Sequence, residues 1–257
     1  MTSKNRALTW GSGTWRIAGL LVGAFLSLTA AGAAQAAPAL LAHQAPLELD
    51  GSASSWILTS TALVLLMTLP GLALFYGGMV RRKNVIATIT QSVGVAAVVT
   101  LAWFAAGYSL SFGVGQPIGA YSGDEVNSVI GGLQAAFLRG VTPETAYAAA
   151  PGLPEYLWIA FQMTFAIITP ALVTGAFAER LKYSGLLLFT GLWTLLVYAP
   201  ICHWVWGGGF LGSAGVLDFA GGAVVHVNSG VAGLVCAVFL GARRGYGVSP
   251  IVAHNPV

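Results

Sequence analysis

Five long apolar runs limit what this chain can fold into. Each is at least as long as the roughly 20 residues that a helix needs to cross the apolar core of a bilayer. They cover residues 56–80, 85–112, 156–178, 185–206 and 219–242. Charged residues make up only 7% of the 257 residues, against about 25% in soluble domains. The sequence therefore predicts an all-α polytopic membrane protein, with five transmembrane helices in one membrane domain at 37–257 and no second, soluble domain.

The first 36 residues have the layout of a cleaved signal peptide. Lys4, Arg6 and Arg16 precede an apolar run at 17–33, and the small-residue triplet Ala-Gln-Ala follows at 34–36. A basic start, an apolar middle and a small-residue cleavage site are typical of secretory signals. An uncleaved first span is the alternative, and it is less well supported because no basic cluster follows the run. Cleavage would place the mature N-terminus outside.

The basic residues after the signal peptide predict the orientation. Seven of the eight lie in segments that alternate to one side of the membrane, and only Arg139 lies on the other. The seven are Arg81, Arg82, Lys83, Arg180, Lys182, Arg243 and Arg244. Under the positive-inside rule these segments face the cytoplasm, so we expect a multi-pass protein of the cell (inner) membrane. Eight acidic residues balance the eight basic ones, which argues against a nucleic-acid partner.

The chain lacks the short motifs of cofactor, metal and nucleotide sites. There is no CxxC, P-loop or GxSxG pattern, and Cys202 and Cys236 fall inside predicted spans, where they act as small apolar packing residues. A hydrolase built on His226 and Ser229 has no activating acid nearby. We therefore expect no cofactor and no enzyme.

The fifth run carries two polar side chains that need a reason to be there. Asp218 stands where the run begins, so its carboxylate can accept hydrogen bonds from the free amides of the first helical turn, although cation ligation is a second role. His226 lies eight residues further, about 12 Å along a helix axis. We expect its imidazole to be buried near mid-membrane, either packed against a neighbouring polar residue or bound to a polar guest.

Two aromatic segments complete the candidate site. Phe161 and Phe165 share a helix face in the third run, with Gln162 between them in need of a partner. Trp206 ends the fourth run, where tryptophans normally mark the membrane interface but where an aromatic face can also attract a cation.

These segments together resemble the ammonium transporter (Amt/Mep/Rh) family. The residues that carry the resemblance are LFYGGMVRRKN at 74–84, AFQMTF at 160–165, GAFAER at 175–180, HWVWGGG at 203–209 and DFAGGAVVHVNSG at 218–230. It extends over about 54–256. The family fold has eleven spans in two inverted five-helix repeats plus a final helix, so the resemblance implies that this chain carries the first repeat.

The resemblance also implies a role for each candidate residue. Trp206 looks like the recruitment tryptophan and Phe165 like one of two gate phenylalanines, with Phe161 and Gln162 around it. Asp218 looks like the aspartate that shapes the recruitment site, and His226 like the first of two pore histidines. The implied substrate is ammonium, passed as ammonia, with methylammonium possible. The implied assembly is a homotrimer in the lipid bilayer, regulated by a PII-type protein.

Three activities stay open at this point. The chain transports ammonium, or it is a truncated membrane fragment that does not conduct, or it senses ammonium. The second gate phenylalanine, the recruitment serine and the second pore histidine of the family have no counterpart in these 257 residues.

Overall fold

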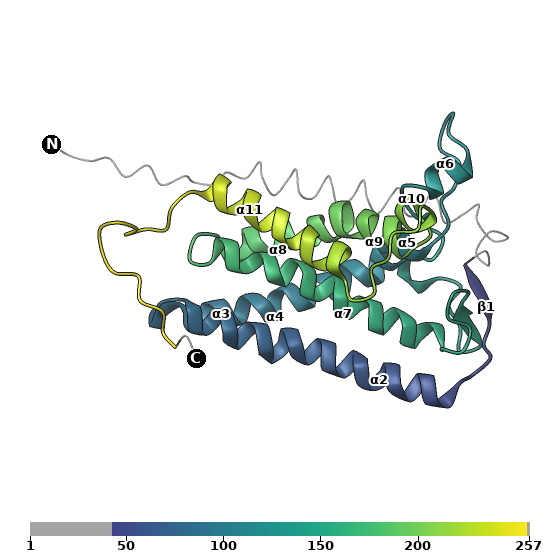
Figure 1. The fold of residues 1–257 in the computed structure, drawn as a ribbon, viewed down its shortest axis with the longest axis horizontal. Coiled ribbons are helices and arrows are strands. Elements are labelled where there is room, and N and C mark those ends of the chain that lie inside the picture. The colour runs from purple at the N-terminus through teal and green to yellow at the C-terminus, as the bar shows by residue number, and fades with distance from the viewer. Residues whose placement is uncertain (1–42, 256–257) are drawn as a thin grey trace. The chain divides into compact units, whose positions relative to one another are not determined.

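The computed structural model describes residues 43–255, and the predicted signal peptide at 1–36 lies outside them. Within the described residues, five helices are long and apolar enough to cross a membrane. They are Gly51–Met79, Arg82–Phe112, Glu155–Phe177, Tyr183–Ser213 and Gly222–Leu240. These helices lie alongside one another (Figure 1). They overlap the five predicted runs and confirm the predicted fold class.

Each span consists of consecutive helical elements. The first contains α2 (Gly51–Leu66), η2 (Met67–Leu72) and α3 (Ala73–Met79). The second contains η3 (Arg82–Asn84), α4 (Val85–Ala102), η4 (Trp103–Gly107) and α5 (Tyr108–Phe112). The third contains α7 (Glu155–Val173) and η6 (Thr174–Phe177); the fourth contains α8 (Tyr183–Trp193), η7 (Thr194–Tyr198), α9 (Ala199–Val205) and α10 (Phe210–Ser213). The fifth contains η8 (Gly222–Val227) and α11 (Asn228–Leu240). Of these, η2, η4, η7 and η8 are π-helical. The first span is kinked at Leu69, whose main chain is not helical, and the fourth is interrupted between α9 and α10.

The segments between spans add small elements at one end of the bundle. They are α6 (Gly123–Asn127), η5 (Ala136–Leu138), β1 (Gln44–Pro46) and β2 (Thr145–Tyr147). β1 pairs antiparallel with β2, with Gln44 opposite Tyr147. This short sheet, which the sequence analysis did not predict, ties the chain before the first span to the loop before the third.

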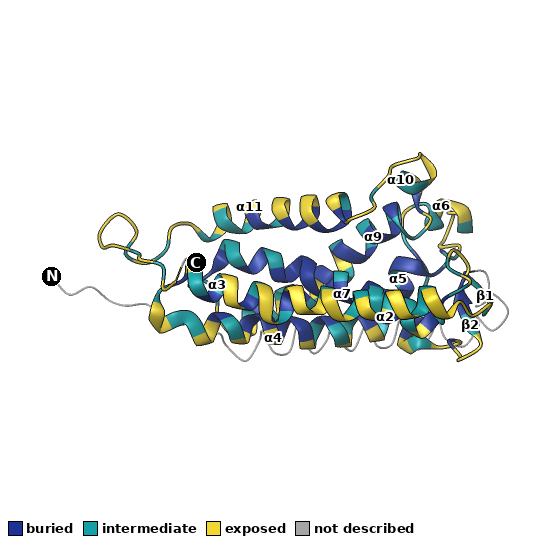
Figure 2. Cartoon of the chain, turned by 60° about the horizontal axis from the view of Figure 1, so that its bottom comes forward, coloured by how far each residue is buried: buried dark blue, intermediate teal, exposed yellow. Residues whose placement is uncertain are grey.

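The third span is the centre of the bundle. In its most apolar stretch 61% of the residues are buried, against 11% in the first span and 22% in the fifth. Trp103 contributes to this core, because its ring is buried and its indole N–H donates to the carbonyl oxygen of Ile159 at 3.2 Å. Figure 2 shows exposed residues along the outward faces of α2 and α11. These two helices therefore have apolar faces that no described residue covers.

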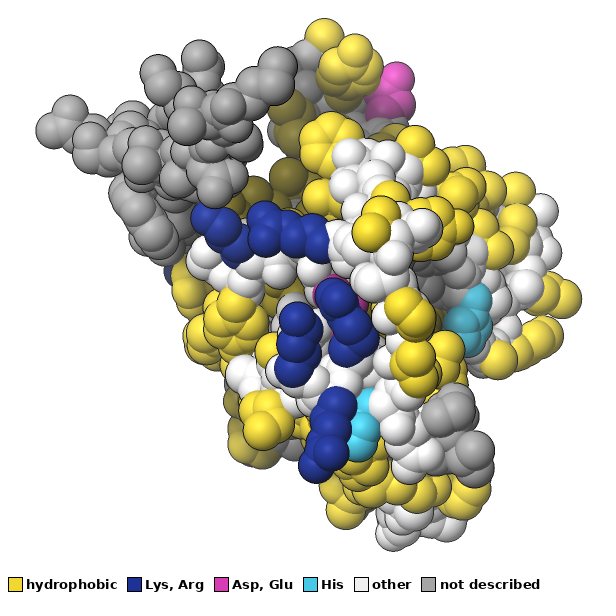
Figure 3. Space-filling model, turned by 90° about the vertical axis from the view of Figure 1, so that its left-hand side faces the viewer, with side chains coloured by type: hydrophobic (Ala, Val, Ile, Leu, Met, Phe, Trp, Pro, Cys, Tyr) yellow, Lys and Arg dark blue, Asp and Glu magenta, His cyan; other side chains and the backbone are white. Residues whose placement is uncertain are grey.

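One end of the bundle, here called the basic end, collects the positive charge. Its members are the seven residues predicted to face the cytoplasm, and Figure 3 shows Lys and Arg side chains gathered on this end. Glu179 is the acidic residue among them. Its carboxylate pairs with Arg81, with Nη2 to Oε2 at 2.9 Å, and accepts a hydrogen bond from Asn84 Nδ2 at 2.7 Å. Burial raises the pKa of Glu179, but the hydrogen bonds from Arg81 and Asn84 outweigh it and lower the pKa to about 2.

Close approach of the first and third spans depends on Gly175. The Tyr76 hydroxyl donates to the carbonyl oxygen of Leu172 at 2.8 Å. A Cβ atom at Gly175 would lie 2.7 Å from the Tyr76 ring, which is too close for van der Waals contact. The two helices would have to separate to admit any side chain there.

We predict that Gly175→Ala destabilises the protein by about 1–3 kcal/mol, the usual cost of overpacking. The control is Gly185→Ala, where a Cβ meets Leu181 at an ordinary 3.6 Å and the expected change is within about 0.5 kcal/mol. Thermal unfolding of both variants in detergent measures the difference. Equal melting temperatures would show that the Tyr76 ring moves aside at no cost, and would contradict the prediction.

We predict that the stabilisation from Glu179 is lost in acid. The folded pKa of about 2 lies below the ordinary value of 4.5, so the contribution is complete above pH 4.5 and disappears as the pH falls toward 2. At roughly 1.4 kcal/mol per pKa unit it amounts to about 3 kcal/mol. Glu179→Gln should therefore lower the melting temperature at pH 7, and the gap from the unsubstituted protein should narrow below pH 4.5. Glu144→Gln, at an exposed position, should have little effect at either pH.

Candidate functional site

Three aromatic side chains from two spans form a continuous cluster. The Phe161 and Phe165 rings meet edge to face on α7, with centroids 5.0 Å apart and an interplanar angle of 89°. Trp206 follows the last residue of α9 and places its ring against Phe165, at 5.8 Å and 69°. The predicted sharing of a face by the two phenylalanines is confirmed. We call these three residues the aromatic cluster.

Asp218 caps the fifth span, as predicted, but the helix begins four residues after it, at Gly222. One carboxylate oxygen accepts the amide of Gly222 at 2.7 Å, and the other accepts those of Ala223 and Val224, each at 2.9 Å. The helix begins at Gly222 and not at Phe219, because Gly221 turns the chain with a positive φ of 77°. Both oxygens face the positive end of the helix dipole, which favours capping over direct cation ligation.

Asp218 is also joined to the aromatic cluster. The Trp206 indole N–H donates to the main-chain carbonyl oxygen of Asp218 at 2.8 Å. This bond connects the loop before the fifth span to the end of the fourth. The partly exposed Trp206 ring and the Asp218 carboxylate therefore lie at the same end of the bundle, opposite the basic end.

The expectation of a buried His226 is wrong, and its place along the helix differs from the expected one. Because η8 begins at Gly222, His226 is only four residues into the helix, about 6 Å along its axis instead of about 12 Å. It is also exposed, because Val224 and Val225 fill the buried face of η8. The imidazole lies on the side of the helix that the other described spans leave uncovered.

Two further polar residues lie in these spans, Gln162 and Ser229. Gln162 is buried, but its Oε1 atom has no hydrogen-bond partner among the described residues. Ser229 donates its hydroxyl to the main-chain carbonyl oxygen of His226 at 3.3 Å and not to the imidazole. That geometry gives a Ser-His hydrolase no activated nucleophile.

His203 is a structural residue whose role the sequence analysis missed. It is fully buried, with Nδ1 2.9 Å from the carbonyl oxygen of Ser111 and Nε2 2.6 Å from that of Asn127. The ring thus joins α9 to the end of α5 and to α6. It holds the main chain three residues before Trp206.

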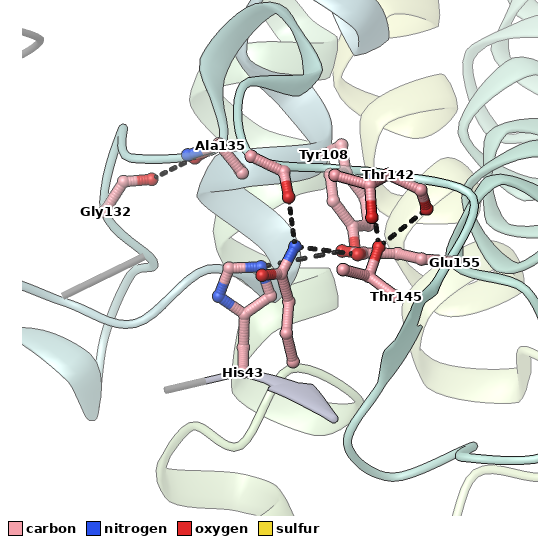
Figure 4. Close-up of polar contacts among 10 residues, drawn as sticks. His43, Tyr108, Gly132, Ala135, Thr142, Thr145 and Glu155 are labelled. Atoms are coloured by element: carbon pink, nitrogen blue, oxygen red, sulfur yellow. Dashed lines mark hydrogen bonds and ion pairs between the residues drawn. The ribbon is translucent and has the colours of Figure 1, made fainter. Parts of the chain in front are cut away.

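Glu155 was also missed, and it organises the same end of the bundle. The side chain is fully buried and accepts hydrogen bonds from the Tyr108 hydroxyl at 2.7 Å and from Gln44 Nε2 at 2.8 Å. His43 Nε2 lies 3.7 Å from the same carboxylate (Figure 4). A buried carboxylate needs such partners because an unpaired charge is costly. Glu155 therefore holds β1 and α5 against the start of α7.

Comparison with known proteins assigns the chain to a protein family. The pattern that defines the Ammonium Transporter Family matches residues 55–256. The chain belongs to this ammonium transporter family.

The similarity extends to individual family members. An ammonium transporter from Bacillus subtilis is 51% identical over 194 residues, which are 75% of this chain and 44% of that protein. One from Aquifex aeolicus is 44% identical over 209 residues, 81% of this chain and 47% of the relative. The crystal structure of Candida albicans Mep2 superposes with a TM-score of 0.65 at 36% identity, covering 76% of this chain and 40% of that one. The chain therefore spans about half the length of the ammonium transporters it matches.

We predict that removing the Asp218 cap destabilises the start of the fifth span. Asp218→Ala leaves three amides without their acceptor and should cost about 0.5–2 kcal/mol, as helix caps do. Hydrogen exchange of the 222–227 amides, measured by mass spectrometry in detergent, should accelerate. The control is Asp124→Ala, an exposed position where no such change is expected. Unchanged exchange in Asp218→Ala would contradict the capping role.

Proposed function

We propose that this chain takes part in moving ammonium across the cell membrane, by recruiting the ion at the outer end and passing it inward as ammonia. The observation that carries this proposal is the aromatic cluster with Asp218 joined to it. It combines an aromatic surface, two rings in edge-to-face contact on the central helix and a fixed negative charge at one end of the bundle.

The recruitment step follows from the chemistry of Trp206 and Asp218. An indole face attracts a cation through its quadrupole by about 0.5–2 kcal/mol. The Asp218 carboxylate is occupied by three amides, so it acts through its potential and not as a ligand. Such a site holds ammonium weakly and releases it easily.

Selection of ammonia follows from where the charged residues lie. In the five spans, the Asp, Glu, Lys and Arg side chains are Arg82, Lys83 and Glu155, all within the first two residues of a span. A bare cation that moved deeper would meet no counter-charge and would pay several kcal/mol for desolvation. Neutral ammonia avoids most of this cost, and potassium has no neutral form. Deprotonation at the outer end therefore separates the two ions.

Phe165 and His226 supply the next contacts in this proposal. The Phe161–Phe165 pair blocks the way for water below Trp206, and a neutral imidazole at His226 offers one donor and one acceptor to ammonia or to the released proton. Net charge movement accompanies transport if the proton also crosses. Methylammonium fits the same chemistry.

The full pathway requires a surface opposite His226. The imidazole is exposed, and α2 and α11 leave apolar residues uncovered. We infer that the half of the family fold beyond this chain packs there and closes the pore. The alternative activity is that the 257 residues alone form a membrane protein that does not conduct. An ammonium sensor is a weaker alternative, because no described element reports occupancy.

Orientation and partners complete the proposal. The basic end faces the cytoplasm by the positive-inside rule, which places the aromatic cluster at the outer surface. A homotrimer and regulation by a PII-type protein are included on the basis of the family resemblance alone.

We predict ammonium-driven currents in proteoliposomes when the chain is supplied with a second half, and none from the 257 residues alone. Trp206→Leu should raise the half-saturating ammonium concentration about 5- to 30-fold, as loss of about 1–2 kcal/mol of cation–π attraction requires. His226→Ala should lower the maximal current about tenfold or more.

The matched control is Trp204→Leu. That indole donates to the carbonyl oxygen of Val129 at 2.7 Å and packs on Phe210, so its loss should leave the half-saturating concentration within about twofold of the unsubstituted protein. If the completed protein shows no current and no ammonia-driven pH change, the proposal of transport is refuted. Equal effects of the two tryptophan substitutions would refute recruitment by Trp206.

A further inference from the structure

Arg180 binds the main chain at the inner end of the helix that carries His226. Its guanidinium donates through Nη1 to the carbonyl oxygens of Gly241 and, at 3.5 Å, Ala237, and through Nη2 to that of Ala176. Ala237 lies in the last turn of α11, Gly241 directly follows that helix, and Ala176 belongs to η6. Arg180 therefore bridges the inner ends of the fifth and third spans.

The other attachments of α11 are apolar packing, in which Ala232, Cys236 and Leu240 contact the core. Its buried residues are Asn228, Ser229 and Gly233, all in its first half, whereas Phe239 in its last turn is 87% exposed. The last carbonyl groups of a helix lack intrahelical donors and carry partial negative charge. A buried guanidinium is well suited to satisfy them. Among the described residues, Arg180 is the side chain that donates to the main-chain carbonyls at this end of the helix.

Glu179, the residue directly before Arg180, has an unusual main-chain conformation. Glu179 has φ +63°, in the left-handed region that residues with a side chain rarely occupy. Its carboxylate is fixed to Arg81 and Asn84 on the segment that joins α3 to α4. The Glu179 side chain thus points to the segment before α4, and the Arg180 side chain points to the end of α11. The strained main chain at Glu179 persists because both side chains are bound.

The fifth span is therefore charged at both ends by residues outside its helix. Asp218 accepts the first amides at the N-terminal end, and Arg180 donates to the last carbonyls at the C-terminal end. Each charge complements the dipole at its end. Together they fix how far the helix extends along the membrane normal, and hence the height of His226 beside the aromatic cluster.

We propose that Arg180 is a positioning residue for His226, acting along the helix from about 22 Å away, the length of the 15 residues to Gly241. The role in transport rests on the proposed function. Arg180 touches neither the recruitment site nor the substrate path next to it. Its loss lets the helix shift or tilt, which moves the imidazole while Trp206 and Asp218 stay in place.

The first measurement needs no transport. Nitroxide labels at positions 156 and 238, both exposed, in a background where Cys202 and Cys236 are replaced by Ala, report the spacing of α7 and α11 by pulsed electron paramagnetic resonance. Arg180→Ala should shift the mean distance by about 1.5 Å or more, the rise of one residue, and broaden the distribution. Arg180→Lys, which keeps the charge but loses the forked donor geometry, should restore part of the original distribution.

The second measurement separates positioning from loss of fold. In the complete transporter, Arg180→Ala should lower the maximal current about tenfold and leave the half-saturating ammonium concentration within about twofold, since recruitment is untouched. Lys182→Ala, an exposed neighbour, should change neither distance nor current.

Three results would overturn the positioning role. They are an unchanged distance distribution in Arg180→Ala, a shifted distribution with unaltered currents in a conducting protein, and an equal effect of Lys182→Ala. If the unsubstituted complete protein carries no current, the proposed function fails, and the distances still decide whether Arg180 positions the fifth span.

Discussion

Burial of the third span is the constraint on which the arrangement of the other helices depends. A helix surrounded by protein needs its charged ends satisfied, and both carboxylates that flank this span are. Glu155 binds Tyr108 and Gln44 at one end, and Glu179 binds Arg81 and Asn84 at the other. Tyr108 and Gln44 lie on two different segments of the chain, and Arg81 and Asn84 lie together on a third. The two carboxylates therefore fasten the second span and the segments around the first to the central helix. Apolar contacts along the helices then determine how the spans pack between these two ends.

The first and fifth spans expose apolar faces that no described residue covers. Helix packing in bilayers relies on small and polar residues because lipid tails are as apolar as leucine. The open face of η8 presents His226, and Gly230 follows on the same side of α11. An imidazole facing lipid would be costly. A protein surface opposite it removes that cost, which agrees with a chain that spans about half of its relatives.

Position along the chain could be predicted from the sequence far better than contact between distant segments. The five spans follow from apolar length, and the Phe161–Phe165 contact follows from helical spacing. The place of His226 along its helix was misjudged because the turn at Gly221 delays the helix start by three residues. The Glu155 network escaped because its partners lie 47 and 111 residues away. An isolated acid before an apolar run reads as a helix start, and only the folded chain brings Tyr108 and Gln44 to it.

The distribution of charge along the five spans links stability to selectivity. Charged side chains that fasten helices to one another lie at the ends, where water or helix termini can share their charge. Between the ends, the spans are held by packing and by uncharged hydrogen bonds such as that from Trp103 to Ile159. The same separation that avoids the cost of burying ions leaves the interior without any counter-charge for a passing cation. A chain fastened in this way stabilises a cation only near its surface. In the proposed function, any polar species that crosses is therefore neutral, or gives up its proton beside the aromatic cluster before it moves inward.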